Sequence, residues 1–377
     1  MKEKVAVIGA GNGGYAFTVF LTQRGHSVNL YESEEFKENI EEIKTRGGIE
    51  SYGEVCGFVK PNLVTIDIKE AIDDVNVIIM PVPAFAHETL FNKILPHLKK
   101  GQIVLICPDN LGTLRFYEML KKQNKENDIL VAGTASLLFV AKKDKEGLGP
   151  ARINVDGVKQ QIRISAMPAR NNEQIKDTFN NLFPNVKMVN NALENALSNV
   201  NHQLHPAPMI LNAGRIESNE KFKFYFEGHT ESVDKVLVDV GKEKIKVTNE
   251  FGLDVDDFDN IFSIYYKDKS TKTSNIHEKI STNICYRNVS SPDSLKSRFV
   301  IEDINYGLVL VSSMGKKCGI ETPVIDSLIN LACSLNQENY WEQGITLEKL
   351  GFSNMSNEEV VNYLINGFNK PIRVEKI

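Results

Sequence analysis

Apolar runs alternate with helix-like segments through the first half of the chain. Residues 4–9 are a short run rich in β-branched side chains, and the amphipathic segment that follows ends at Gly25. Further strand-like runs lie at 26–32, 75–82, 101–108 and 128–132, with helical patterns at 85–99 and 113–124. Strands that alternate with helices predict a doubly wound, parallel α/β sheet of the Rossmann type.

The pattern changes near residue 190. Strand-like runs at 151–158 and 160–169 and a helix at 172–182 come before that point. Beyond it the periodicity is almost purely helical, at about 191–205, 208–218, 230–249, 294–318 and 323–335. Since 377 residues exceed what one compact core accommodates, we predict an α/β domain over 1–190 and an all-α domain over 191–377.

One segment does not fit a compact helical domain. Residues 265–297 are polar and weakly periodic, and such a long irregular stretch is unusual unless it covers something. A lid or substrate-selecting segment and a plain surface excursion are equally compatible with the pattern.

Composition narrows the classes of function. The net charge is −5, and Lys and Arg are spread along the chain without forming a basic stripe, so we expect no nucleic-acid partner. The five cysteines form no CxxC pair and no cluster has zinc spacing, which predicts a reducing compartment and no metal. No charged-then-apolar leader and no apolar run near 18 residues is present, so we expect a cytoplasmic protein with no membrane contact.

A glycine turn follows the first predicted strand. Gly9-Ala10-Gly11-Asn12-Gly13-Gly14 satisfies G-x-G-x-x-G at the start of a predicted helix. Gly9 permits the tight turn, Gly11 lets a pyrophosphate approach the backbone, and Gly14 brings helix and strand together. With the helix N-terminus at Asn12 to attract phosphate, the turn predicts a nicotinamide dinucleotide site.

An acidic residue follows the second strand at a fitting distance. Glu32 lies 23 residues after Gly9, where a carboxylate can accept hydrogen bonds from ribose hydroxyls and repel a 2′-phosphate. We therefore predict that NAD(H) is favoured over NADP(H), although Glu34 and Glu35 are near enough that the ribose contact stays open among the three.

The loop after the strand at 75–82 is expected to border the same cofactor, since ligands lie at the carboxyl ends of parallel strands. Pro83 is our candidate there. His87, a few residues on, is discounted, because a lone histidine at a helix start is more often a cap or a surface residue.

A histidine stands out in the second predicted domain. Asn201 and His205 are four apart and share one helix face, and we expect Pro206 and Pro208 to end that helix directly after His205. On a helical wheel, His202 lies about 100° from Asn201, so the two histidines cannot both point the same way. From these residues alone, a structural role in the core is the default for either histidine.

A carboxylate stands out in the helix predicted at 294–318. Asp303 lies in an apolar stripe, where a charge is costly unless it is paired. A histidine partner would make an acid/base pair, whereas a Lys or Arg partner would be structural. Glu302 lies on the same helix face as Arg298, four positions earlier, so we predict an ordinary i,i+4 ion pair between them.

These motifs together resemble the opine dehydrogenase family, the octopine and nopaline dehydrogenase-like enzymes. The resemblance runs nearly the full length, through GAGNGG, VPAFAHE, NHQLHPAPMILNAGRIE and RFVIEDINYGLVLVSSMGKKCG. It implies NADH- or NADPH-dependent reductive condensation of a 2-oxo acid with the amino group of an amino acid. It further implies that His205 is the catalytic histidine and Asp303 its partner, and that Asn201 and Arg298 bind substrate, Arg298 at a carboxylate; Arg215 and Arg287 are weaker candidates.

Two departures leave questions open. Five residues separate Arg298 and Asp303 by roughly 140° on an ideal helix, so either the helix begins after Arg298 or the arginine reaches round from its rim. The block at 133–143, GTASLLFVAKK, is less polar than is typical of the family, which leaves the substrates open.

Two other functions compete with this interpretation. A simple 2-oxo acid or sugar-phosphate dehydrogenase of the ketopantoate reductase or glycerol-3-phosphate dehydrogenase type would share the first domain but use a lysine in the second. A nicotinamide-binding sensor without turnover would leave the pairing of His205 and Asp303 unexplained. The apolar helices of the second domain suggest a homodimer.

Overall fold

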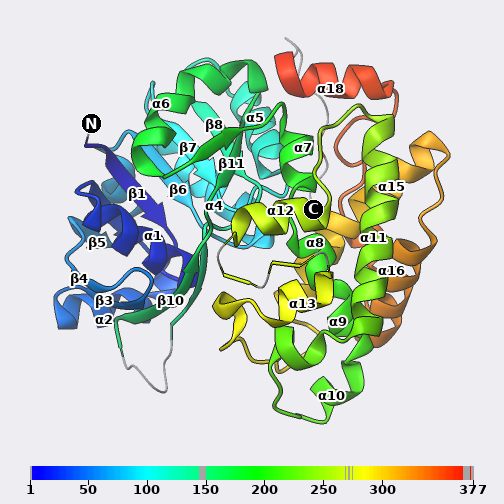
Figure 1. The fold of residues 1–377 in the computed structure, drawn as a ribbon. Helices are drawn as coiled ribbons and strands as arrows, with labels where there is room; N and C mark the ends of the chain where they lie inside the picture. Colours follow the sequence, from blue (N-terminus) through cyan, green and yellow to red (C-terminus); the bar gives the residue numbers. More distant parts are fainter. Residues whose placement is uncertain are drawn as a thin grey trace. The chain divides into compact units, whose positions relative to one another are not determined.

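The computed structural model describes residues 2–143, 150–267, 269–270, 272–273, 275–367 and 374 (Figure 1). By internal packing the chain divides into two compact units. The first comprises Met1–Asn195 and Leu364–Gly367, and the second contains Ala196–Tyr363. The domain limits 1–190 and 191–377 remain a prediction. That prediction did not foresee that Leu364–Gly367 would belong to the first unit.

The first unit contains an eight-stranded sheet with the order β12-β11-β8-β7-β6-β1-β2-β5 among the described residues. Its strands are β1 (Lys4–Ile8), β2 (Ser27–Tyr31), β5 (Leu63–Thr65), β6 (Val77–Met80), β7 (Ile103–Ile106), β8 (Leu130–Thr134), β11 (Ile162–Met167) and β12 (Val186–Met188). Every neighbouring pair is parallel except β8 and β11. The Rossmann-type sheet is thus confirmed. The antiparallel pair was not predicted; the described residues between β8 and β11 contain no crossover helix, and a parallel pair needs such a crossover.

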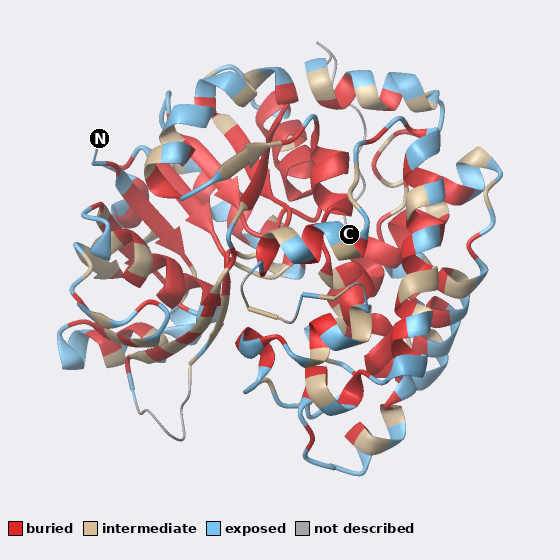
Figure 2. Cartoon of the chain, in the orientation of Figure 1, coloured by how far each residue is buried: buried red, intermediate tan, exposed pale blue. Residues whose placement is uncertain are grey.

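Both faces of this sheet are covered, which explains the unbroken apolar strands (Figure 2). Side chains that point to one face, such as Val5 and Val7, form a core with residues of α1 (Asn12–Gln23) and α6 (Asn172–Leu182). Those on the other face pack against α3 (Ile68–Ile72), α4 (His87–Ile94) and α5 (Gly112–Lys122). The strands' carboxyl ends are therefore left for ligands.

A second, four-stranded sheet was not predicted. It has the order β4-β3-β10-β9, from β3 (Ile49–Gly53), β4 (Gly57–Val59), β9 (Phe139–Lys142) and β10 (Arg152–Val158). Its apolar residues join the core that contains α1. The strands from 49 to 59 were missed because they are short, and because β3 ends at Gly53, which has φ +82°, and β4 begins at Gly57.

The second unit is helical, as predicted. Its α-helices over the described residues are α8 (Asn201–Leu204), α9 (Pro206–Leu211), α10 (Ala213–Glu217), α11 (Glu231–Glu250), α12 (Phe258–Tyr265), α13 (Ile276–Ser281), α14 (Arg298–Asp303), α15 (Val309–Cys318), α16 (Pro323–Asn336), α17 (Tyr340–Gln343) and most of α18 (Asn357–Asn366). Helix α7 (Ala192–Leu197) links the two units, and α2 (Glu38–Arg46) belongs to the first.

Two turns of π-helix interrupt the second unit. They span Phe224–Gly228 and Ile304–Leu308, and the second joins α14 to α15. Such turns are rare and occur frequently at functional sites.

The segment at 265–297 is partly helical. It includes α13 and a 3₁₀ turn, Ile284–Tyr286, and it buries Ile280, Cys285 and Tyr286. Residues 268, 271 and 274 lie outside the described residues, so the lid interpretation stays a prediction.

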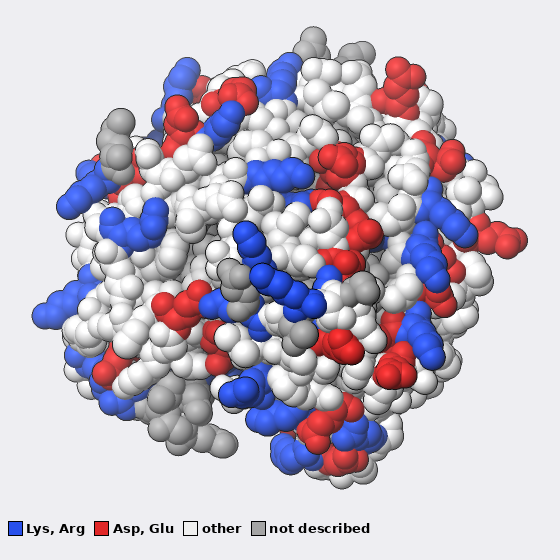
Figure 3. All heavy atoms as spheres, in the orientation of Figure 1, with Lys and Arg blue, Asp and Glu red and all other residues white. Residues whose placement is uncertain are grey.

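Charge is distributed without a large field of one sign on the face that Figure 3 draws, where acidic and basic side chains are interspersed. Within the described ranges, no helix combines the length and the apolar character needed to cross a bilayer.

Candidate active site

The glycine turn lies between β1 and α1, with Gly9 at φ +101° and Gly11 as the N-cap of α1. A β-carbon on Gly14 would lie 1.8 Å from the carbonyl oxygen of Gly9, so only glycine allows helix and strand to approach this closely. A β-carbon on Gly11 would meet nothing within 4 Å. Open space above Gly11, at a helix N-terminus, is what a dinucleotide's pyrophosphate requires.

Glu32 follows β2 and is buried, with 8% of its surface exposed. Its Oε2 accepts a hydrogen bond from the backbone N–H of Ala10 at 2.9 Å, and its Oε1 accepts one from the N–H of Ser33 at 2.8 Å. The carboxylate is thereby fixed beside the glycine turn. Glu34, by contrast, is exposed and pairs with Lys37, and Glu35 is exposed, so Glu32 is the best placed of the three.

Two further residues near the strand ends have distinct surroundings. Pro83 is half-buried and is the N-cap of a 3₁₀ turn, Ala84–Ala86. His87 is fully buried rather than on the surface, and its Nδ1 lies 3.2 Å from Nη2 of Arg115. Burial, with the Arg115 charge, lowers the pKa of His87 well below its ordinary value, so it is a neutral core residue.

His205 lies at a break between two short helices. It is the C-cap of α8, and its N–H still bonds to the carbonyl of Asn201 at 3.1 Å. The helix ends at His205, as predicted, and Pro206 then begins α9, because its fixed φ suits the first helical position.

The imidazole of His205 is held on three sides. Nδ1 lies 2.7 Å from Oδ2 of Asp303, and Nε2 lies 2.8 Å from the hydroxyl of Tyr225. Phe299 stacks on the ring, with centroids 3.9 Å apart and planes inclined by 12°. His205, Asp303 and Tyr225 are all buried, so both the position and the plane of the ring are fixed.

Asp303 is the last residue of α14, directly before the π turn. Burial raises the pKa of its carboxyl, and the Arg298 charge offsets part of that rise. A buried carboxyl in contact with an imidazole orients the ring and can balance a charge on it, which suits proton transfer by the ring.

Arg298 begins α14, so the alternative in which the helix starts after it is wrong. Its Nε lies 3.5 Å from Oε2 of Glu302, which confirms the predicted i,i+4 pair. The Arg298 side chain is 47% exposed, and its charge acts on both Asp303 and Tyr225.

The other residues predicted to bind substrate differ in their exposure and in their contacts within the protein. Asn201 is half-buried at the start of α8, and its N–H donates to Oδ1 of Asn199 at 3.1 Å. Arg215 bonds to Glu220 at 2.7 Å and to Glu227, which engages its guanidinium, while Arg287 is exposed.

His202 is a structural residue. Its Nε2 lies 3.1 Å from the amide nitrogen of Asn199, and burial lowers its pKa to about 3. A β-carbon on Gly307 would lie 2.3 Å from Cγ of His202, so the π turn that follows Asp303 packs directly on this ring.

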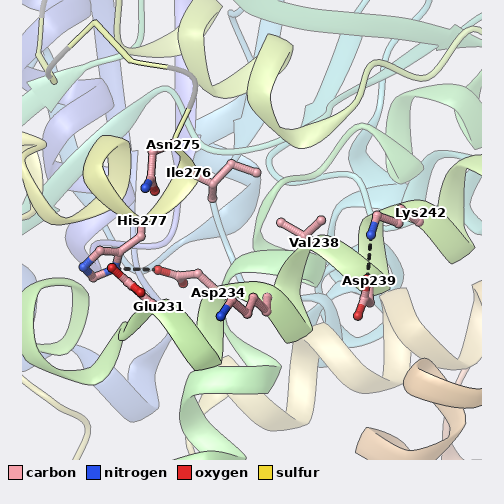
Figure 4. A pocket seen from close by; sticks show the side chains of 9 residues that line it. Glu231, Asp234, Val238, Asp239, Lys242, Asn275, Ile276 and His277 are labelled. Atoms are coloured by element: carbon pink, nitrogen blue, oxygen red, sulfur yellow. Dashed lines mark hydrogen bonds and ion pairs between the residues drawn. The ribbon is translucent and has the colours of Figure 1, made fainter.

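A separate pocket of about 650 Å³ lies over α11 (Figure 4). It is lined by Glu231, Asp234, Lys235, Val238, Asp239, Lys242, Asn275, Ile276 and His277. Asp234 accepts from Nδ1 of His277 at 2.8 Å and from Nδ1 of His229 at 2.7 Å, and Asp239 pairs with Lys242 at 2.8 Å. Two of its three carboxylates are thus engaged. Among the described residues, no group of three or more His, Cys, Asp or Glu side chains is arranged so that it could hold a metal ion.

Sequence reasoning missed Tyr225 and Phe299 as partners of His205. On a helical wheel Phe299 lies in line with Asp303, which was a usable signal. Tyr225 lies among the aromatics of KFKFYFEG, where nothing in the pattern separates it from Phe224 and Phe226.

Comparison with known proteins bears on this site. A family model described as NAD/NADP octopine/nopaline dehydrogenase, alpha-helical domain, matches residues 188–336, and one for the N-terminus of NAD-dependent glycerol-3-phosphate dehydrogenase matches 4–136. An opine dehydrogenase of Arthrobacter sp. (strain 1C) is 31% identical over 352 residues, which cover 93% of this chain and 96% of the relative.

The chain belongs to the opine dehydrogenase family. As a member of this family it is an NAD(P)-dependent oxidoreductase that acts on CH–NH donors. Solved structures share the fold: octopine dehydrogenase with NADH and L-arginine has a TM-score of 0.73 at 19% identity, covering 97% of this chain and 98% of its own. Yersinopine dehydrogenase with NADP⁺ bound has a TM-score of 0.66 at 12% identity, with 97% and 98% covered.

Proposed function

We propose that the chain joins the amino group of an amino acid to the carbonyl carbon of a 2-oxo acid and reduces the product with NADH. The observation that carries the proposal is the buried His205, held between Asp303 and Tyr225. A single-step hydroxy-acid dehydrogenase needs one proton transfer, whereas condensation needs several, and a histidine that a carboxyl holds in one orientation suits repeated transfer.

His205 moves the protons of the condensation. It takes a proton from the attacking amine, and in its protonated form gives one to the carbinolamine hydroxyl, so that water leaves and the iminium carbon is exposed. Asp303 holds the ring in one orientation and stabilises its positive charge. When bound, the reduced nicotinamide supplies the hydride.

Arg298 and Asn201 bind substrate in this proposal. Both substrates carry carboxylates, and a guanidinium that is about half exposed can bind one bidentately. The amide of Asn201, one turn before His205, supplies a second polar contact.

Gly9, Gly11, Asn12, Gly14, Glu32 and Pro83 form the cofactor site in this proposal. The open space over Gly11 and the fixed carboxylate of Glu32 fit a dinucleotide. We propose that NADH is preferred to NADPH, because Glu32 accepts from ribose hydroxyls and repels a 2′-phosphate.

The test is NADH oxidation at 340 nm with pyruvate and each of the twenty amino acids, with each component omitted in turn. Oxidation that requires both an oxo acid and an amine supports the proposal and identifies the amine. Oxidation with an oxo acid alone would instead indicate a simple hydroxy-acid dehydrogenase, and binding without turnover would indicate a sensor. The homodimer stays a prediction, which the mass of the particle in solution would test.

A further inference from the structure

Lys143 follows β9 and lies against the glycine turn, although more than a hundred residues separate the two in sequence. Its backbone N–H donates to Oδ1 of Asn12 at 2.9 Å. Since Asn12 is the first residue of α1, this bond ties the end of β9 to the helix N-terminus where a dinucleotide's phosphates are expected.

The ammonium group of Lys143 reaches past Asn12 toward the ribose side of the turn. Nζ donates to the carbonyl of Ala10 at 3.3 Å and to Oδ1 of Asn39 at 2.9 Å. It also lies 4.0 Å from the centroid of the Tyr15 ring, an attractive cation–π distance. Tyr15 in turn donates its hydroxyl to the carbonyl of Asn39 at 2.6 Å, so the position of the ammonium is well defined.

Ala10 and Asn39, which accept hydrogen bonds from the ammonium group of Lys143, also bind Glu32. Ala10 donates its N–H to Oε2 of Glu32, and Asn39 donates its side-chain amide to the same oxygen at 3.4 Å. A cation and an anion are therefore held side by side on one rim of the turn, with Ala10 and Asn39 contacting both.

This arrangement bears on which dinucleotide is accepted. Glu32 alone would repel the 2′-phosphate of NADP(H) strongly. A neighbouring ammonium weakens that repulsion and can make charge-assisted hydrogen bonds to the phosphate oxygens. We propose that Lys143 binds the 2′-phosphate of NADP(H). Glu32 then favours NADH, Lys143 favours NADPH, and the balance of the two sets the size of the preference for NADH. The inference rests on the proposed cofactor site.

The experiment measures dinucleotide binding without oxo acid or amine, by quenching of protein fluorescence, for the wild type and the Lys143→Gln, Lys143→Arg and Lys142→Gln variants. Glutamine can still donate to Ala10 and Asn39 but carries no charge. We expect Lys143→Gln to weaken NADPH about tenfold and NADH less than threefold. We expect Lys143→Arg to retain NADPH binding, and the exposed neighbour Lys142 to be replaced without effect on either.

Adenosine 2′,5′-bisphosphate and 5′-AMP serve as competing probes, since they differ only in the 2′-phosphate. The bisphosphate should lose affinity in Lys143→Gln while 5′-AMP does not. An equal loss for NADH and NADPH would place Lys143 at the pyrophosphate that both share and overturn the proposal. Unchanged binding of both, or a wild type that does not bind NADPH at millimolar concentration, would overturn it as well. Turnover is not measured, so failure of the condensation reaction would leave this result intact.

Discussion

Nδ1 of His205 lies 2.7 Å from Oδ2 of Asp303, across 98 positions of sequence. Neither side chain is more than 7% exposed, so solvent does little to screen the interaction. Burial raises the pKa of Asp303, and the Arg298 charge offsets part of that rise.

Asp303→Asn should lower kcat by about 10²- to 10⁴-fold, because an amide cannot stabilise a charged imidazole. NADH binding should change little, since Asp303 is not part of the proposed cofactor site. The measurement is stopped-flow turnover beside an NADH titration. Wild-type kcat in this variant would rule out the proposed role of the pair.

Tyr225→Phe tests the contact at Nε2, the second ring nitrogen of His205. Burial raises the pKa of Tyr225 well above its ordinary value, so its hydroxyl stays protonated, 2.8 Å from Nε2 of His205. If the neutral ring carries its proton on Nδ1, toward Asp303, the hydroxyl donates to Nε2. Loss of that donor favours a protonated ring, and we expect the acid limb of the kcat profile to move to higher pH.

The matched control for this variant is Tyr286→Phe. Tyr286 stacks on Tyr225 at 4.0 Å between centroids, but its hydroxyl bonds to Tyr266 rather than to His205. If both variants shift the profile equally, the hydrogen bond to Nε2 is not the cause.

Gly11→Ala and Gly14→Ala should separate binding from folding. A methyl on Gly11 enters open space, so the protein should fold with an unchanged melting temperature but bind NADH at least tenfold more weakly. A methyl on Gly14 collides with the carbonyl of Gly9 and should lower the melting temperature itself. Calorimetry with and without NADH distinguishes the two, and tight NADH binding by Gly11→Ala would contradict the assignment of the turn.

Lys159 should make stability depend on pH. It is buried against Ser136, 2.7 Å from its hydroxyl, and burial lowers its pKa from 10.5 to about 7. Between about pH 7 and 10.5 the unfolded chain binds a proton that the folded chain does not, so the free energy of unfolding should rise with pH, by up to about 1.4 kcal/mol per unit.

Urea midpoints of the wild type and Lys159→Met at pH 8, 9 and 10 test this, since other titrations cancel in the difference. The variant should be more stable at pH 8, and its advantage should shrink as pH rises. Lys176→Met, at an exposed position of α6, is the control. A constant difference across the range would show that Lys159 keeps an ordinary pKa in the fold.

Much of this structure could be predicted from local patterns in the sequence. The glycine turn, Glu32 and the helix at 172–182 follow from periodicity and turn chemistry within a few dozen residues. Pairing of His205 with Asp303 needed the family resemblance, because a helical wheel shows that Asp303 is buried without showing which partner it meets.

The missed features all depend on tertiary context. No short-range signal says that β11 runs antiparallel to β8, that β3 pairs with β10 a hundred residues away, or that Tyr225 and not Phe226 reaches Nε2. The helix end at His205 was predicted, but the start of the next helix at Pro206 was not, because proline both ends helices and begins them, and only the backbone decides which.

The return of Leu364–Gly367 to the first unit has a consequence for how the protein is made. Gly367 lies so close to the side chain of Tyr117 that an added β-carbon would be 2.9 Å from the phenol oxygen. The first unit is thus completed by residues that are synthesised after Ala196–Tyr363 of the second unit, and a chain released at residue 195 would lack this segment. A nascent chain that has emerged only that far cannot yet complete the unit's packing, so the two units mature together and cannot be separated by a single cut.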